Sequence, residues 1–423
     1  MKSLTSLSAI KWSLLFNFTL FATVSCRKDV NPKQQEEVLT PAFNSISNKT
    51  KGESEKIYVN DVSQLYAAIN DAANAGKTIV LAAGTYVLNA SYPNDGRLEL
   101  LENMQLLGQP GHPEEVIIDA SALPGTSFIP PLNFPLPRTG AIRMGRGLNA
   151  IEWLTVKGNA STQALSVIDT DLIWAGVSQI RVAHCVVTGG RQGIDIRNPG
   201  VAGINRILEA ELTENEIFGN VVQQGQGIEV QNSNGASDAT IRATLNGNYV
   251  HDNHVGLRTF NNNANNINTN SGSISIESHA DRFEENGIGI YLNAALNQGA
   301  TSTANDNVLV FEAHGTTIKN STGAVPSEPS PSCGIYLAGA NTLSTGEASN
   351  NRLTMNLWGC SISGNQGAAD IIAFGAISAT SNLAGINNVV EIQLQGVSKQ
   401  ATDLSTASLP TESAGTNRVN IFR

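Results

Sequence analysis

The chain has 423 residues, of which 41% are hydrophobic and only 15% are charged, and it contains 39 glycines. Low charge, few aromatic residues and many turn-forming residues are typical of β structure with many turns. The net charge is −10, and no basic stripe stands out, which argues against nucleic acid as a partner. An acidic polysaccharide stays compatible with this charge, because local arginines or a bound cation can offset the field.

The first 26 residues read as a bacterial export signal. Lys2 and Lys11 supply positive charge, and an apolar run follows over residues 12–24. The run is short for a membrane span, so it predicts a signal peptide rather than an anchor helix. The ending Thr23-Val24-Ser25-Cys26 resembles a lipoprotein box, with Thr23 in place of the usual leucine. This resemblance implies lipidation at Cys26 and an outer-membrane or cell-surface lipoprotein; the alternative is a cleaved signal and a periplasmic or secreted protein.

Residues 27–56 are polar and contain two prolines, which predicts a flexible tether. A short amphipathic helix is expected next, over residues 62–76, because Leu65, Ala68, Ile69 and Ala72 share one helical face. Gly76 would end this helix as its C-cap. A helix here would cover the open edge of a following sheet.

The rest of the chain repeats a short unit about every 30 to 45 residues. Each unit carries an Asn or Gly turn, and soon afterwards a Gly followed by alternating apolar residues. The turn positions are Gly190, Asn220, Asn253, Asn286 and Asn365, with Asn320 one residue out of register. Each unit reads as three strands separated by turns, with little helical periodicity. One unit cannot bury its apolar face alone, so units must stack.

This pattern resembles the right-handed parallel β-helix of the pectate-lyase-like superfamily, over residues 57–423. The segment VSQLYAAINDAANAGKTIVLAAGTYVLN, residues 62–89, is similar to the opening of such proteins, where a helix covers the first rung. The resemblance implies an all-β solenoid with an N-terminal capping helix and a polysaccharide ligand. It says little about chemistry, since the superfamily contains lyases, hydrolases, epimerases and proteins without activity.

Alternation along each strand predicts which side chains point out of the coil. In the strands that begin with Gly, two outward columns follow. The first contains Asp195, Glu229, Arg258, Tyr291 and Tyr336, and the second Arg197, Gln231, Phe260, Asn293 and Ala338. Glu229 beside Arg258 is an ordinary cross-strand ion pair or a ligand-binding pair. Tyr291 beside Tyr336 is a surface aromatic pair or a platform for stacking a sugar.

The first strand of each unit gives two more outward columns. One contains Arg181, Glu211, Thr244, Glu277, Glu312 and Asn356, and the other Ala183, Thr213, Asn246, His279, His314 and Trp358. Neighbouring rungs are about 4.8 Å apart. The sequence therefore predicts a square of Glu277, His279, Glu312 and His314, with Trp358 one rung further along.

Three chemistries fit this square, beside a purely structural ladder of solvated polar side chains. Two carboxylates and two imidazoles could bind a divalent cation such as zinc or calcium. A histidine oriented by a carboxylate could abstract a proton in the β-elimination of a uronate polymer, with a cation or Arg242 neutralising the uronate. Glu277 and Glu312 could also be the paired carboxylates of a glycoside hydrolase, at a spacing that favours retention.

The chain lacks the local signatures of the enzyme families on this fold. Arg197-Asn198-Pro199 is followed by Gly200 rather than leading to a second arginine, and His314-Gly315 has no Asp-rich triad beside it. The sequence thus predicts a monomeric cell-envelope or secreted β-helix that acts on or binds polysaccharide. A polysaccharide lyase or glycoside hydrolase, a non-catalytic carbohydrate-binding protein, and an adhesin or spacer all remain open.

Overall fold

The computed structural model describes residues 54–124, 140–159, 166–170, 176–198, 206–221, 225–233, 236–263, 268–323, 333–342, 346–366, 369–378, 385–397, 404–406 and 417–423. The predicted signal peptide, its Cys26 and most of the predicted tether lie outside these residues. No helix among the described residues has the length and apolar character needed to cross a membrane.

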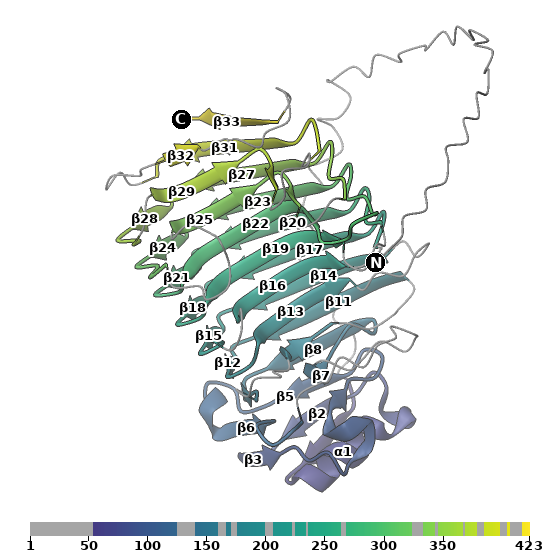
Figure 1. The fold of residues 1–423 in the computed structure, drawn as a ribbon. Coiled ribbons are helices and arrows are strands. Elements are labelled where there is room, and N and C mark those ends of the chain that lie inside the picture. Colours follow the sequence, from purple (N-terminus) through teal and green to yellow (C-terminus); the bar gives the residue numbers. More distant parts are fainter. Residues whose placement is uncertain are drawn as a thin grey trace, which may run out of the picture. The chain divides into compact units, whose positions relative to one another are not determined.

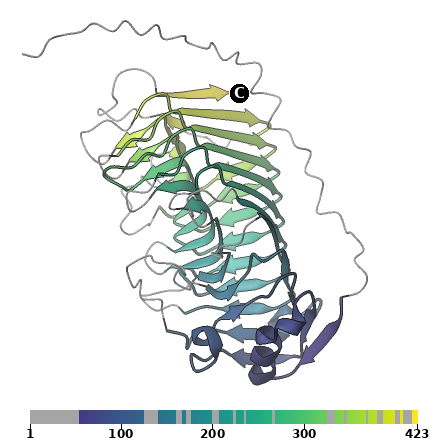
Figure 2. The same cartoon turned by 90° about the vertical axis from the view of Figure 1, so that its right-hand side faces the viewer.

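Parallel strands wind into a right-handed coil with three sheets, so the predicted β-helix is confirmed (Figures 1 and 2). Sheet A contains, in spatial order, β1 (Lys56–Val59), β2 (Thr78–Leu81), β5 (Gln105–Leu107), β8 (Leu148–Glu152), β11 (Gly176–Ala183), β14 (Arg206–Thr213), β17 (Thr240–Asn246), β20 (Ser273–His279), β23 (Val308–His314), β27 (Arg352–Trp358), β31 (Val389–Gln395) and β33 (Arg418–Phe422).

Sheet B is made of short strands that each follow a strand of sheet A, in most rungs after one tight turn. It contains β3 (Gly84–Val87), β6 (Val116–Asp119), β9 (Thr155–Lys157), β12 (Val186–Thr188), β15 (Glu216–Phe218), β18 (Tyr249–His251), β21 (Arg282–Glu284), β24 (Thr317–Lys319) and β28 (Ser361–Ser363).

Sheet C closes each turn of the coil. Its main path contains β4 (Leu98–Glu99), β7 (Gly140–Arg143), β10 (Ser166–Asp169), β13 (Gln192–Asn198), β16 (Gln226–Ser233), β19 (Val255–Asn263), β22 (Ile288–Asn297), β25 (Cys333–Ala338), β29 (Ala369–Phe374) and β32 (Leu404–Thr406). Two short strands, β26 (Asn341–Thr342) and β30 (Ile377–Ser378), extend it beside β22.

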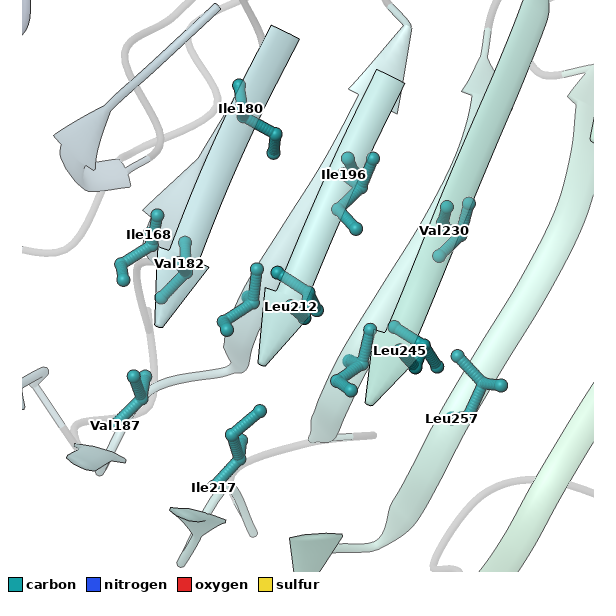
Figure 3. Close-up of a cluster of buried hydrophobic side chains, with 14 of the residues drawn as sticks. Ile168, Ile180, Val182, Val187, Ile196, Leu212, Ile217, Val230, Leu245 and Leu257 are labelled. Carbon is teal, nitrogen blue, oxygen red and sulfur yellow. The ribbon is translucent and has the colours of Figure 1, made fainter. Parts of the chain in front are cut away.

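Columns of inward-pointing side chains fill the interior of the coil. Ile196, Val230 and Leu257 come from sheet C, and Leu212 and Leu245 from sheet A (Figure 3). All five are fully buried. Because each rung adds residues of the same kind at the same place, the apolar core is continuous along the stack.

Helix α1 (Val62–Asn70) covers the first rung, as predicted. Asp61 caps it, since Asp61 Oδ1 accepts a hydrogen bond from Gln64 N at 2.8 Å. Leu65 and Ile69 are buried beneath it. The predicted end of the helix is wrong: α1 stops at Asn70 and a 3₁₀ turn (Ala72–Asn74) follows, leaving Ala72 exposed. Two further 3₁₀ turns span Pro93–Gly96 and Pro113–Glu115.

Amide ladders hold the turns of successive rungs together. Asn220, Asn253 and Asn286 form the predicted ladder, with side-chain bonds of 2.8 and 3.1 Å between neighbours. Where Asn320 was out of register, Ser321 takes the ladder position and its N–H bonds Asn365 Oδ1 at 3.0 Å. The same amide oxygens also accept from backbone N–H groups in the turns, as Asn253 Oδ1 does from Asn220 N at 3.1 Å and Asn286 Oδ1 from Asn253 N at 3.0 Å, so these buried donors are satisfied.

Candidate functional sites on the outer faces of the coil

The predicted square forms on the outer face of sheet A. Strands β20 and β23 pair so that Glu277 lies opposite Glu312 and His279 lies opposite His314. Strand β27 places Trp358 beside His314. The intervening residues are buried and the four side chains of the square are half-buried, so the square faces away from the core. We call these four residues the Glu–His square.

The two halves of the Glu–His square have different hydrogen bonds. His279 Nε2 lies 2.8 Å from Glu277 Oε1, with side chains 39% and 27% exposed. Glu312 instead accepts a hydrogen bond from Asn356 Nδ2 at 3.1 Å. The imidazole and carboxylate on β20 therefore form a dyad in which Glu277 can orient the ring of His279.

The rings beside this dyad form a stack along the sheet. The ring centroids of His279 and His314 are 5.1 Å apart with planes inclined by 13°. Those of His314 and Trp358 are 4.4 Å apart with planes inclined by 16°. Because the faces of the His314 ring contact its neighbours, a sugar can reach this ring only at its edge.

The Glu–His square does not fit a metal ion in this arrangement. The lone pair of an imidazole nitrogen lies in the ring plane, so two stacked, nearly parallel rings do not direct their nitrogens at a point between them. Across the described ranges, no three His, Cys, Asp or Glu side chains come together in a way that could hold a metal. Of the chemistries that the sequence left open for the square, cation binding is therefore the one that this arrangement of the described side chains supports least.

Arg242 lies apart from the square. The register places it beside Ser275 in the neighbouring column, and its Nη1 is 3.3 Å from Glu209 Oε1 on β14. The guanidinium thus pairs with a carboxylate on the rung before its own, whereas Glu277 lies on the rung after it. In this structure, Arg242 is not placed to neutralise a uronate at His279.

The outer face of sheet C has the predicted register but not the predicted exposure. Tyr291 and Tyr336 are paired and stacked, with centroids 4.6 Å apart. Their exposed fractions are only 2% and 4%, and Arg258 is 9% exposed. The prediction of an exposed aromatic surface is therefore wrong here. The two rings belong instead to a second apolar cluster, outside the main core, with Ile372 and Phe374.

The same face buries a set of charged side chains on the preceding rungs, which we call the charged row. It consists of the buried Arg143, Asp169, Asp195, Glu229 and Arg258, together with Arg197, whose side chain is 18% exposed. Arg143 Nε is 3.3 Å from Asp169 Oδ1, and Arg197 Nη2 is 2.6 Å from Asp195 Oδ2. Arg197 Nη2 is also 3.8 Å from Glu229 Oε1. Asp169 and Asp195 have no exposed surface.

The charged row meets the aromatic cluster at Arg258. Its Cζ lies 5.0 Å from the ring centroid of Phe260 and 5.4 Å from that of Tyr291, which is cation–π geometry. The predicted neighbour relation between Glu229 and Arg258 is confirmed by the strand register. The basic group thus joins a polar half and an aromatic half of one continuous face.

Two buried amides on this face have no hydrogen-bond partner among the described residues. Both side-chain polar atoms of Gln226 and both of Asn293 are in this condition, and each residue is fully buried. Their strand partners Val255, Phe260 and Ala338 lie on the outer side of the sheet. A buried amide without partners costs about 1–3 kcal/mol per group, so such groups mark a place where a ligand or water would be stabilised.

Sequence reasoning missed Arg143 and Asp169 because Ala141 and Val167 stand in their strands at the position where the later units have Gly. Alternation in GAIRM and SVIDT, residues 140–144 and 166–170, was the available signal. It places Arg143 and Asp169 opposite one another, and Asp169 opposite Asp195.

A cluster on the outer face of sheet B was also missed. The His251 ring stacks with Phe218 and with Tyr249, at centroid distances of 5.1 and 4.1 Å. Arg282 Cζ lies 4.2 Å from the centroid of Tyr249, and Arg282 makes two bonds of 3.0 and 2.8 Å to Glu284. These groups satisfy one another, which is sufficient to explain them as a surface ladder.

Comparisons with known proteins find distant structural likenesses. No protein-family model matches the chain, and no curated protein matches it. The A-module of the mannuronan C-5 epimerase AlgE4 from Azotobacter vinelandii is similar in structure at 16% identity and a TM-score of 0.31, covering 84% of this chain and 98% of that one. PfbA, a surface adhesin of Streptococcus pneumoniae, gives 8% identity and a TM-score of 0.36, covering 82% and 89%.

Pectate lyase Pel9A is similar at 12% identity and a TM-score of 0.32, covering 86% of this chain and 82% of that one. The protein has the right-handed parallel β-helix fold. At these identities and scores the likeness does not indicate what the chain binds.

Proposed function

We propose that this protein binds a polysaccharide along the outer face of sheet C. The observation that carries the proposal is the charged row, which buries carboxylates and guanidinium groups on an outward face, beside two buried amides without partners. Carboxylates, guanidinium groups and amides can donate to and accept from sugar hydroxyls. Tyr291 and Phe260 add apolar ring surface at one end, as ligand sites usually do.

A purely stabilising role explains the charged row less well. Burying ion pairs is expensive, and apolar residues of similar volume often stabilise a fold as well or better. The rungs from Tyr291 onward show that this sheet accepts an apolar outer face, since Ile288 and Ile372 occupy it. The polar rungs therefore require another reason, and ligand binding supplies one.

The row offers groups that can bind acidic and neutral sugars. Arg143, Arg197 and Arg258 supply planar donors that suit a carboxylate or sulfate. The three neighbouring carboxylates keep the row close to neutral overall, so neutral sugar units would also be accepted. Since every member of the row except Arg197 is buried in this structure, binding requires the face to become accessible, and slow association is expected.

A second candidate function is cleavage of the polymer at the Glu–His square, and the 2.8 Å contact between His279 Nε2 and Glu277 Oε1 favours it. With Glu277 orienting the ring, Nδ1 of His279 would abstract the proton in an elimination. In a hydrolysis, Glu277 and Glu312 on adjacent strands would act as the paired carboxylates.

We propose further that the chain is exported and anchored through a lipid on Cys26. The support is the sequence pattern of residues 1–26 alone, and the outer membrane or cell surface is the proposed location. Metabolic labelling with a fatty acid, compared between the chain and Cys26→Ser, would test this directly.

The binding proposal is tested by affinity gels and calorimetry with acidic and neutral polysaccharides. Asp195→Asn/Glu229→Gln should abolish retention, because it removes both carboxylates around Arg197. Glu391→Gln, on the outer face of sheet A, is the matched control and should bind like the original chain. Retention that survives Asp195→Asn/Glu229→Gln in a folded protein would refute sheet C as the binding face.

Cleavage is followed in the same panel through unsaturated products and new reducing ends. Unsaturated products that disappear in Glu277→Gln/His279→Ala would indicate a lyase, and reducing ends without unsaturation a hydrolase. Retention of a polymer without either product would indicate a binding protein that does not cleave it. No retention of any polymer would favour an adhesin or spacer.

A further inference from the structure

The apolar core is covered differently at its two ends. At the first rung, α1 packs on β1 and β2, with Leu65 and Ile69 buried. At the other end, β33 is the last strand of the sheet (Figure 1). It pairs with β31 along one edge, and none of the described strands pairs along its other edge. Such an edge is a template for a further strand.

The apolar residues of β33 are incompletely covered. Val419 and Ile421 continue the inward columns of Val390 and Ile392. Val390 and Ile392 have no exposed surface, whereas Val419 and Ile421 are only half-buried. Phe422 is 56% exposed. The last rung therefore carries apolar surface that one more layer would bury.

The backbone of β33 shows which groups face the open edge. Arg418 N bonds Asn388 O at 3.0 Å, so Arg418 directs its backbone groups toward β31. In a parallel strand alternate residues face the same neighbour, which directs Asn420 and Phe422 the same way. The N–H and C=O groups of Val419 and Ile421 then point toward the open edge.

We propose that two copies of this chain pair end to end, through antiparallel contact of their β33 strands about a two-fold axis at Asn420. In this register Val419 lies opposite the partner's Ile421, and both residues present their backbone groups to the edge. Two such pairs give four interchain hydrogen bonds. Asn420 meets its own copy as a non-hydrogen-bonded pair, with Cα atoms about 4.5 Å apart.

The side chains of β33 are self-complementary in this register. The half-buried Val419 and Ile421 meet apolar partners on the inner side, which extends the core of one coil into the next. On the outer side, Arg418 lies opposite the partner's Phe422, within reach of a cation–π contact. No arginine faces an arginine. Because the contact joins the same strand of both copies about a two-fold axis, the assembly closes at two copies and does not grow into a filament.

Asn420→Cys in the full chain tests the register. A non-hydrogen-bonded pair brings Cα atoms within the range of about 4.4–6.8 Å that a disulfide needs, so mild oxidation should convert most of the chain to a covalent dimer. Thr354→Cys is the matched control, since it lies in the same outward column two rungs earlier. Thr354→Cys and the original chain should give at least ten-fold less dimer under the same oxidation.

Sedimentation of the full chain measures the association itself. The original chain should sediment as a dimer at micromolar concentration, and Val419→Lys should shift it to monomer with the circular dichroism of the coil unchanged. A monomeric original chain, or equal cross-linking of Asn420→Cys and Thr354→Cys, would overturn the proposal. Either result would mean that another segment of the same chain, or another partner, covers the edge.

Discussion

Asp281 is a buried carboxyl that completes a ladder of amides, and its replacement by Asn should stabilise the protein at neutral pH. Asn215 bonds Asn248 at 2.9 Å, and Asn248 bonds Asp281 at 2.8 Å. Ser278 Oγ donates to the other carboxyl oxygen at 2.6 Å. Burial raises the pKa of Asp281 from 3.8 to about 6, against the lowering effect of these hydrogen bonds.

The sign of the pH dependence follows from this raised pKa. The folded protein holds the proton more tightly than the unfolded chain, so the contribution of Asp281 is most favourable below about pH 4. It is lost as the pH rises through about 6. A difference of about two pKa units corresponds to about 3 kcal/mol. An Asn at this position keeps an amide oxygen as the acceptor and carries no charge, so its contribution does not change with pH.

Urea unfolding of Asp281→Asn and the original chain at pH 4, 6 and 8 measures this effect. Between pH 4 and 8, the free energy of unfolding of the variant should gain about 2–3 kcal/mol relative to the original chain. Asp238→Asn is the control, because Asp238 is exposed and its positive φ of 58° also suits Asn. A difference for Asp281→Asn that is constant across this pH range would refute the reasoning.

Three other substitutions test the ladder, the core and the surface cluster. Asn253→Ala should lower the free energy of unfolding by about 3 kcal/mol, since it breaks a buried amide ladder. Urea unfolding should show this as a lower urea concentration at the midpoint of the transition. Phe311→Ala should cost about 3–5 kcal/mol, because Phe311 is fully buried; calorimetry should show a lower melting temperature, and an unchanged one would contradict the core assignment. Arg282→Ala should cost only about 1 kcal/mol because Arg282 is half-exposed. It should also raise the pKa of Glu284 as followed by NMR, since burial raises that pKa while Arg282 and Lys319 now hold it below its ordinary value.

The register of the coil could be predicted from the sequence to single residues. The pairing of Glu277 with Glu312 is confirmed, although the loop between their strands is long. A side-chain period of two and a fixed turn residue leave only one register that keeps the apolar residues inside. The same reasoning explains why Ser321 replaces Asn320 in the ladder: Asn320 takes the left-handed turn position, with φ of 55°.

The burial of the outward side chains could not be predicted in the same way. Tyr291 and Tyr336 point out of the coil as expected, yet they are buried. Strand alternation gives the direction of a side chain, but burial depends on what lies over the sheet, and strand periodicity contains no information about that. Arg143 and Asp169 could not be found from the repeat, since Ala141 and Val167 replace the Gly that marks it in the later units.

The two faces therefore differ in the physical reason for their polar residues. On sheet A, water screens Glu277 and His279, so a ladder of such residues costs the fold little and needs no ligand to explain it. On sheet C, Asp195 and Glu229 are removed from water, where charges stabilise a fold only if their partners are well placed. The polar side chains of both faces point out of the coil, so their direction does not distinguish the two faces. Their burial does, because burying the charged row costs the fold more free energy than leaving charges in water. A ligand that binds the row would supply partners to Gln226 and Asn293 as well, and should raise the melting temperature further as the logarithm of its free concentration increases above Kd.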